Sequence, residues 1–214
     1  MPNLLNIQVS PRGDKSISRA LGDRFIEHWQ HNHPGGNIVH RDLMETNIPY
    51  MNVDWIGGVY APPEMARTPE MNAALALSAE LIAEVQAADH LLISTPMYNF
   101  TVPAVLKSWI DYIVRPGFTF KLAEGWPGML ENKAAMIIVV SRDFYTPGTA
   151  TDDSDYVSPV LRRVLAFMGI TDVDVVLAGG SLGVNRGVVK MQDHLDEYES
   201  AIAKAAREPS AFTS

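Results

Sequence analysis

The segment from Ser10 to Ser18, which reads SPRGDKSIS, combines three hydroxyl side chains with one glycine and directly precedes a segment of helical period. The first turn of a helix carries unpaired backbone amides and the positive end of the helix dipole, so this loop suits a phosphate group. The same serines could serve only as N-caps, their commonest use at helix starts. The loop matches neither G-x-G-x-x-G nor G-x-x-x-x-G-K-[ST], so neither a dinucleotide-binding motif nor a nucleotide triphosphatase is supported.

A second candidate segment, PMYNF at 96–100, follows the apolar run His90–Thr95. Pro96 at its start and Pro103 shortly after its end make the stretch rigid. Its methionine and two aromatic residues offer a flat apolar wall, and Asn99 offers an amide and a polar side chain for hydrogen bonds. A flavin ring requires such a surface. The alternative, a packed loop of core aromatics, would not need an asparagine at its centre.

A third segment, SRDFY at 141–145, follows another apolar run. Its backbone amides and the Ser141 hydroxyl suit the polar pyrimidine end of a flavin, because donors there stabilise the negative charge of the reduced ring. A solvated loop without a ligand is the alternative.

These segments follow apolar runs of strand length that alternate with segments of helical period, a pattern typical of a parallel sheet covered on both faces. We expect strands over Leu4–Val9, Ile38–Arg41, His90–Thr95, Ala134–Ser141 and Val173–Ala178. Apolar spacing predicts helices within 17–29, 71–85, 106–113, 157–168 and 188–202. The chain is therefore expected to form a single α/β domain, 1–214, folded as a doubly wound three-layer sandwich. Ligands of such sheets bind beyond the carboxyl ends of the strands, where all three segments would lie.

The segment from Leu43 to Arg67 shows neither the apolar run of a strand nor the apolar spacing of a helix. It contains three prolines and the pair Gly57–Gly58, but also four large apolar residues, Tyr50, Trp55, Ile56 and Tyr60. Long irregular connections are uncommon in compact domains. We interpret this one as a binding-site wall or a subunit contact, with a lid as the lesser option.

Composition excludes several classes of function. Apolar residues make up 47% of the chain and charged residues 20%, as in ordinary globular proteins. A net charge of −8 argues against nucleic-acid binding, and no basic run exceeds Arg162-Arg163, so no membrane surface is expected either. The absence of cysteine removes disulfides, thiolate metal sites and cysteine nucleophiles. No signal peptide or apolar run of membrane-spanning length is visible, so a cytoplasmic location is expected.

Taken together, the chain resembles the FMN-dependent NADH-azoreductases, a branch of the flavodoxin-like quinone reductases. The resemblance runs from the first strand to the last helix, and it rests on PMYNF at 96–100, Ser16-Ile17-Ser18, RDL at 41–43 and FMGITD at 167–172. It implies a flavodoxin-like sandwich with strand order 2-1-3-4-5, tightly bound FMN and a homodimer with two sites at its interface. It also implies a ping-pong hydride relay from NADH or NADPH to quinones or azo compounds.

The resemblance assigns roles to particular residues. The FMN phosphate would be held by Ser10, Ser16, Ile17 and Ser18. The ring would contact Pro96, Met97, Tyr98, Asn99 and Phe100, with the Asn99 amide facing flavin N5 and with Tyr98 and Phe100 beside it at the catalytic edge. The pyrimidine side would face Ser141, Arg142, Asp143 and Phe144. The acceptor pocket would be lined by Phe120, Leu122, Tyr145 and Phe167, and Phe167 and the aromatic part of 50–60 would reach toward the partner subunit's site.

Two positions depart from the family pattern. Asp143 and Phe144 stand where relatives usually carry two glycines, which let a backbone approach a ligand closely. An inward-pointing Asp143 would lower the flavin potential. Leu122 stands where relatives often present an aromatic wall. Both departures bear on substrate range more than on cofactor identity.

Other functions remain open alternatives. A flavodoxin-type electron carrier and an enzyme that reduces free FMN both fit the same cofactor, whereas a hydrolase lacks its G-x-S-x-G elbow. Arg12, Lys15 and Arg142 are candidate partners for the extra phosphate of NADPH. No metal site is expected: we interpret His28, His31 and His33 as a solvated helix end, and His194 as a surface residue rather than a base.

Overall fold

A parallel sheet of five strands, in the order β2-β1-β3-β4-β5, forms the centre of the protein. The computed structural model describes residues 1–62, 64–145, 148 and 152–206. The strands are β1 (Asn3–Gln8), β2 (Asn37–Asp42), β3 (His90–Pro96), β4 (Ala134–Val140) and β5 (Asp172–Ala178), and all neighbours pair in parallel. The predicted strands and strand order are confirmed, and no strand end differs from its expected position by more than one residue.

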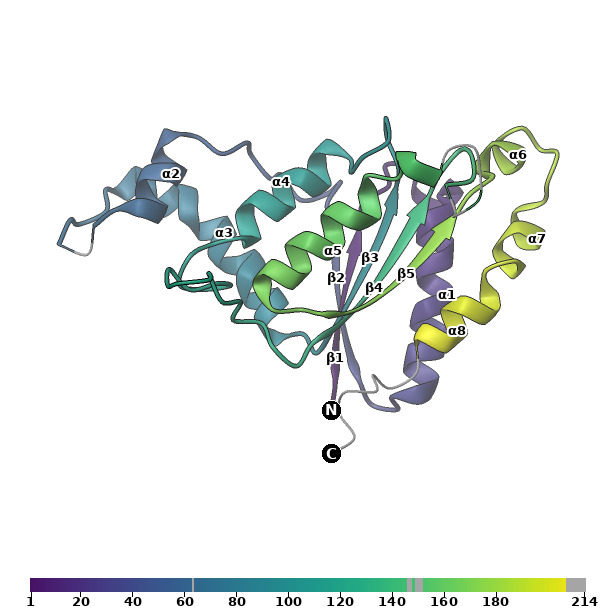
Figure 1. Ribbon diagram of the computed structural model, residues 1–214, viewed down its shortest axis with the longest axis horizontal. Helices are drawn as coiled ribbons and strands as arrows, with labels where there is room; N and C mark the ends of the chain where they lie inside the picture. The colour runs from purple at the N-terminus through teal and green to yellow at the C-terminus, as the bar shows by residue number, and fades with distance from the viewer. Residues whose placement is uncertain (63, 146–147, 149–151, 207–214) are drawn as a thin grey trace.

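Helices cover both faces of this sheet (Figure 1). One face carries α1 (Ile17–Asn32), α7 (Met191–Asp196) and α8 (Glu199–Ala205), and the other carries α3 (Pro69–Ala87), α4 (Ala104–Ile113) and α5 (Val157–Met168). The short α6 (Ser181–Asn185) follows β5, and α2 (Val53–Tyr60) projects with α3 from one end of the molecule. Single 3-10 turns occupy η1 (Gly13–Lys15) and η2 (Asp152–Ser154). Within the described ranges, no helix is both long and apolar enough to cross a membrane.

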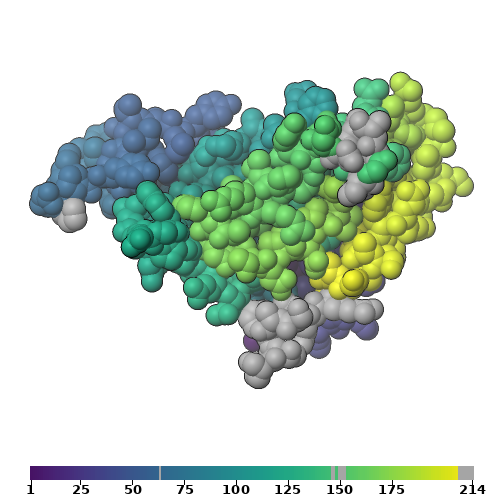
Figure 2. Space-filling model, in the orientation of Figure 1, coloured from purple at the N-terminus to yellow at the C-terminus, as the bar shows by residue number. Residues whose placement is uncertain are grey.

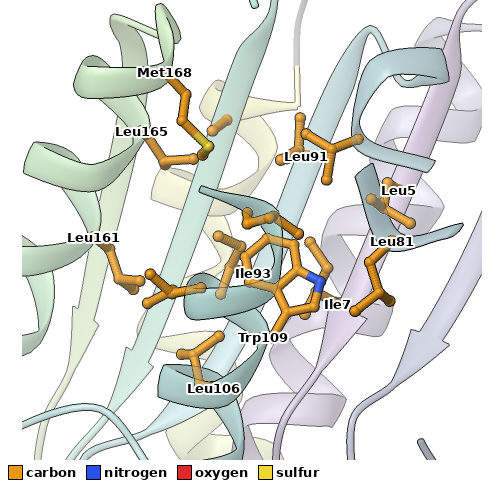
Figure 3. Close-up of a cluster of buried hydrophobic side chains, with 14 of the residues drawn as sticks. Leu5, Ile7, Leu81, Leu91, Ile93, Leu106, Trp109, Leu161, Leu165 and Met168 are labelled. Atoms are coloured by element: carbon orange, nitrogen blue, oxygen red, sulfur yellow. The ribbon is translucent and has the colours of Figure 1, made fainter. Parts of the chain in front are cut away.

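Two apolar cores hold the layers together, because alternate residues of each strand point to opposite faces. In β3, Leu91 and Ile93 enter the core beneath α3, α4 and α5, whereas Leu92 enters the core beneath α1. Trp109 of α4 lies at the centre of the first core, surrounded by strand and helix side chains (Figure 3). Burying each such side chain contributes about 2 kcal/mol. The sheet is therefore a firm support for the loops at its carboxyl edge.

The segment 43–67, expected to be irregular, contains the helix α2. Asn52 caps it by accepting a hydrogen bond from the Trp55 amide at 2.8 Å. Gly57 and Gly58 weaken the helical pattern in the sequence, each costing about 1 kcal/mol in a helix interior. They are tolerated because α3 packs against them: a Cβ added at Gly58 would lie 2.9 Å from Leu75 Cδ1.

The last predicted helix, within 188–202, is two helices instead of one, and α6 precedes them. The break between α7 and α8 falls at Glu197 and Tyr198, and no glycine or proline marks it in the sequence. The Tyr198 hydroxyl donates a hydrogen bond to the Gly179 carbonyl at 3.2 Å, so the break lies against the loop that follows β5.

Two interpretations of histidines are wrong. His194 is 3% exposed and not a surface residue; it packs edge-on against Tyr198. His33 does form the C-cap of α1, but it is buried and stacks on Trp29 rather than lying in solvent. His28 contacts Glu199, and the described residues contain no group of three side chains suited to a metal.

Candidate active site

Loops at the carboxyl edge of the sheet enclose a recess made of two adjoining parts. The first part, of about 210 Å³, lies beside the serine loop and is lined by Ser10, Arg12, Ser16, Ile17, Ser18, Pro96, Met97, Tyr98, Val140, Arg142, Ser181 and Asn185. The second, of about 460 Å³, is lined by Met97, Tyr98, Asn99, Phe100, Arg142, Asp143 and Tyr145. The two parts share Met97, Tyr98 and Arg142, so the structure brings the three predicted segments together around one recess.

The serine loop supplies buried hydroxyls and free amides at one end of the recess. Ser10, Ser16 and Ser18 are each at most 3% exposed. Ser16 caps α1 by accepting from the Arg19 amide at 3.3 Å, and its hydroxyl lies 3.1 Å from that of Ser18. Capping therefore accounts for Ser16 but not for the other two. Within the described residues, the amides of Ile17 and Ser18 have no protein partner, as expected for the first turn of a helix.

The PMYNF segment forms a tight turn with a strained backbone. Tyr98 and Thr101 exchange two backbone hydrogen bonds, of 3.0 and 3.1 Å, and both central residues are left-handed, with φ of 48° at Asn99 and 70° at Phe100. Such a type I′ turn favours asparagine and glycine, so a phenylalanine there stores about 1–2 kcal/mol of strain. The amides of Asn99 and Phe100 donate to no protein acceptor in the described part of the chain.

Phe100 is fixed from the side by the start of α5. Its carbonyl accepts a hydrogen bond from the Tyr156 amide at 3.0 Å, and its ring meets the edge of Tyr145 at 6.4 Å. The turn is therefore strained, fixed in place and open at its amides. Backbone strain of this kind is concentrated at functional sites.

The SRDFY segment takes a different form from the predicted one. The Ser141 hydroxyl donates to the Asp143 carbonyl at 2.7 Å, and Ser141 is buried outside the lining of either part of the recess. The Asp143 carboxylate lies 3.8 Å from the Arg142 guanidinium at the exposed rim. Ser141 thus shapes the loop, and Arg142 offsets the charge of Asp143.

Phe144 packs against the glycine pair that follows β5. A Cβ added at Gly179 would lie 2.7 Å from Phe144 Cδ1, and one at Gly180 would lie 2.7 Å from Phe144 Cζ. Gly179 and Gly180, which have no Cβ, leave the space that the Phe144 ring and backbone occupy. This arrangement explains how the loop accommodates Asp143 and Phe144.

Sequence reasoning considered Arg12 only for the extra phosphate of NADPH and assigned no site role to three other residues that line the recess: Val140, Ser181 and Asn185. The last two come from a fourth loop, after β5, which carried no recognised motif. Arg12 donates to Asn185 Oδ1 at 2.5 Å, so the serine loop and α6 meet across the recess. The glycine pair between a strand and a short polar segment was the signal available in the sequence.

Three of the predicted acceptor-pocket residues lie elsewhere in the single chain. Phe120 and Phe167 contact each other, with ring centroids 4.8 Å apart, and Leu122 is exposed. The segment between α4 and β4 lies beside the end of α5, away from the carboxyl edge of the strands (Figure 1). Of the four, only Tyr145 lines the recess. Phe120, Leu122 and Phe167 line neither part of the recess in the single chain.

Known proteins share this fold and this sequence pattern. Residues 2–202 match the family described as having a flavodoxin-like fold. The chain is 41% identical to an FMN-dependent NADH:quinone oxidoreductase of Burkholderia lata over 98% of both chains, and 41% identical to one of Nostoc sp. over 96% of this chain and 98% of that one. An azoreductase from Bacillus anthracis superposes with a TM-score of 0.85 at 26% identity, over 96% of this chain and 99% of its own. The chain belongs to the flavodoxin-like family of FMN-dependent NADH:quinone oxidoreductases and azoreductases.

Proposed function

We propose that this chain binds FMN in the recess and catalyses hydride transfer from NADH, or NADPH, to quinones and azo compounds. One observation carries the proposal: a strained turn with free amides and a buried serine loop with free amides face a single recess. The first suits the polar edge of a flat ring and the second suits a phosphate. The names of the relatives from Burkholderia lata and Nostoc sp. support the same cofactor and reaction.

The residues of this chain would bind and orient. Ser10, Ser16, Ile17 and Ser18 would donate hydrogen bonds to the phosphate, and the Asn99 amide would donate to flavin N5. Pro96, Met97, Tyr98 and Phe100 would form the wall against the ring, with Arg142 and Asp143 on its pyrimidine side. Ser141 and Phe144 would hold that loop in shape without lining the recess. When bound, FMN supplies the two-electron chemistry. The protein would supply position, and Tyr98 and Phe100, which are 43% and 51% exposed, leave this side of the recess open to solvent.

We infer that donor and acceptor occupy the open part of the recess in turn. Initial rates measured at several fixed quinone concentrations should then give parallel double-reciprocal lines against NADH. Each substrate should inhibit competitively against the other at high concentration. Intersecting lines would mean that donor and acceptor bind together, and would contradict this mechanism.

We also propose that the active form is a homodimer in which a second copy completes the acceptor pocket with its Phe120, Leu122 and Phe167. The α2 region supports this proposal, because Tyr50, Val53, Ile56 and Tyr60 are exposed on a segment that projects from one end of the molecule (Figure 2). Exposed apolar patches of this kind mark interaction surfaces. Sedimentation should show twice the chain mass at micromolar concentration. A fully active monomer would contradict the proposal.

A further inference from the structure

Arg19, in the first turn of α1, extends its side chain back to the carboxyl edge of the sheet. Its guanidinium donates to the Ser10 carbonyl from Nε at 3.1 Å and from Nη2 at 2.7 Å, and from Nη1 to Gln8 Oε1 at 2.7 Å. Nη2 also lies 2.6 Å from Asp42 Oδ2. One side chain therefore joins the end of β1, the start of the serine loop and the end of β2.

Arg19 fixes the direction of the Ser10 peptide. Because its carbonyl is engaged by two N–H groups, the loop that follows begins from a defined orientation, and the Ser10 hydroxyl lines the recess. A guanidinium presents its donors in a rigid planar fork, which a lysine ammonium cannot reproduce. The Ser10 carbonyl oxygen would otherwise repel an anion. Its two hydrogen bonds from Arg19 reduce this repulsion close to the free amides of Ile17 and Ser18.

The placement of this arginine runs against the usual electrostatics of a helix. A cation near a helix N-terminus is unfavourable by some tenths of a kcal/mol, because the dipole is positive there. Asp42 offsets that cost, and it is itself held by accepting from the Met44 amide at 2.9 Å. A matching pair exists further along α1, where Arg24 contacts Asp196 at 2.7 Å and Glu199 at 2.8 Å, but these contacts join α1 to the last two helices.

We propose that Arg19, held by Asp42, is a positioning residue that sets the serine loop for the phosphate of the bound cofactor. This inference rests on the proposed function. It also gives Asp42, the aspartate of the RDL segment at 41–43, the role of holding the Arg19 guanidinium in place. Arg19 acts on the phosphate end alone, so its loss weakens binding of FMN but leaves binding of riboflavin, which lacks the phosphate, almost unchanged.

The test measures equilibrium binding of FMN and riboflavin, by quenching of flavin fluorescence, to cofactor-free protein carrying Arg19→Met, Arg19→Lys or Arg24→Met. Arg24 is the matched control, since its side chain is 15% exposed, Arg19 is 16% exposed, and both lie on one helix with paired carboxylates. We expect Arg19→Met to raise the FMN dissociation constant about 10- to 100-fold, as the loss of charged hydrogen bonds implies. Riboflavin binding should change less than about threefold, and Arg24→Met should leave both constants near wild type.

Each remaining outcome decides the matter. Arg19→Lys should bind FMN as weakly as Arg19→Met does. Wild-type FMN affinity in Arg19→Lys would show that a positive charge is sufficient and that the guanidinium does not position the loop. Equal weakening of FMN and riboflavin, or an equal effect in Arg24→Met, would overturn the inference. If Arg19→Met does not fold, the lysine variant gives the same comparison. A wild-type protein that binds neither flavin would refute the proposed function itself. Normal FMN binding by the Arg19 variants would refute only the role of Arg19.

Discussion

Trp29 donates its indole N–H to Nδ1 of His90 at 2.5 Å inside the core. The two residues join the end of α1 to the start of β3, and His33 stacks on the same indole with ring centroids 4.7 Å apart. His90 must be neutral to accept this bond. Burial, with a smaller contribution from His33, lowers the pKa of His90 from its ordinary 6.5 to about 4, while Asp89 acts in the opposite direction.

This pairing makes the stability of the fold depend on pH. In the unfolded chain His90 takes up a proton near pH 6.5, whereas in the folded chain it does so only near pH 4. Its contribution is therefore fully present above pH 6.5 and is lost as the pH falls toward 4. The loss amounts to at most about 3 kcal/mol, since each unit of pKa shift corresponds to about 1.4 kcal/mol.

Denaturant unfolding at pH 7 and at pH 5 checks this prediction. His90→Gln should be less stable than wild type at pH 7 and should lose less stability between the two values. His31→Gln, an exposed change on α1, the helix that carries Trp29, should follow the wild type. Parallel pH dependences for wild type and His90→Gln would show that His90 is not the responsible group.

The left-handed backbone of Phe100 reverses an ordinary order of stability. In most positions glycine is less stable than alanine, because it loses more backbone freedom on folding. At φ 70° alanine keeps the steric strain and glycine relieves it. Phe100→Gly should therefore be more stable than Phe100→Ala by about 1 kcal/mol, as measured by denaturant unfolding. The opposite order would mean that the turn is not left-handed in solution.

Ser16 caps α1, and the proposed function also assigns it to the FMN phosphate; a matched pair of variants can separate the two roles. Ser16→Ala and Thr68→Ala each remove a helix cap, at α1 and α3, with equal donor distances of 3.3 Å. Each should lower the unfolding free energy by about 1 kcal/mol. Only Ser16→Ala should also weaken FMN binding, by about tenfold, in a fluorescence titration. Unchanged FMN affinity in Ser16→Ala would show that Ser16 caps α1 and does not bind the phosphate.

The sheet could be predicted because its inner strands are short apolar runs bounded by polar residues, as in AAMIIVV of β4. Helix α2 could not, since Gly57 and Gly58 favour a loop locally and only packing against Met71 and Leu75 makes them suitable for a helix. Tertiary contacts of this kind override local propensity.

The recess was predictable where residues adjoin in sequence, as in the serine loop and PMYNF. Asn185 was not, because its place beside Arg12 depends on how the segment after β5 returns over the sheet edge. The role of Ser141 also depended on geometry, since its hydroxyl bonds its own loop. The places of Phe120 and Phe167 relative to a second chain stay a prediction.

One anaerobic experiment tests the central claim most directly: record the visible spectrum of the purified protein with FMN, add NADH, and then add a benzoquinone. We expect a protein-bound flavin spectrum that bleaches with NADH and recovers with the quinone. A protein that takes up no FMN, or whose bound flavin NADH does not bleach, would contradict it.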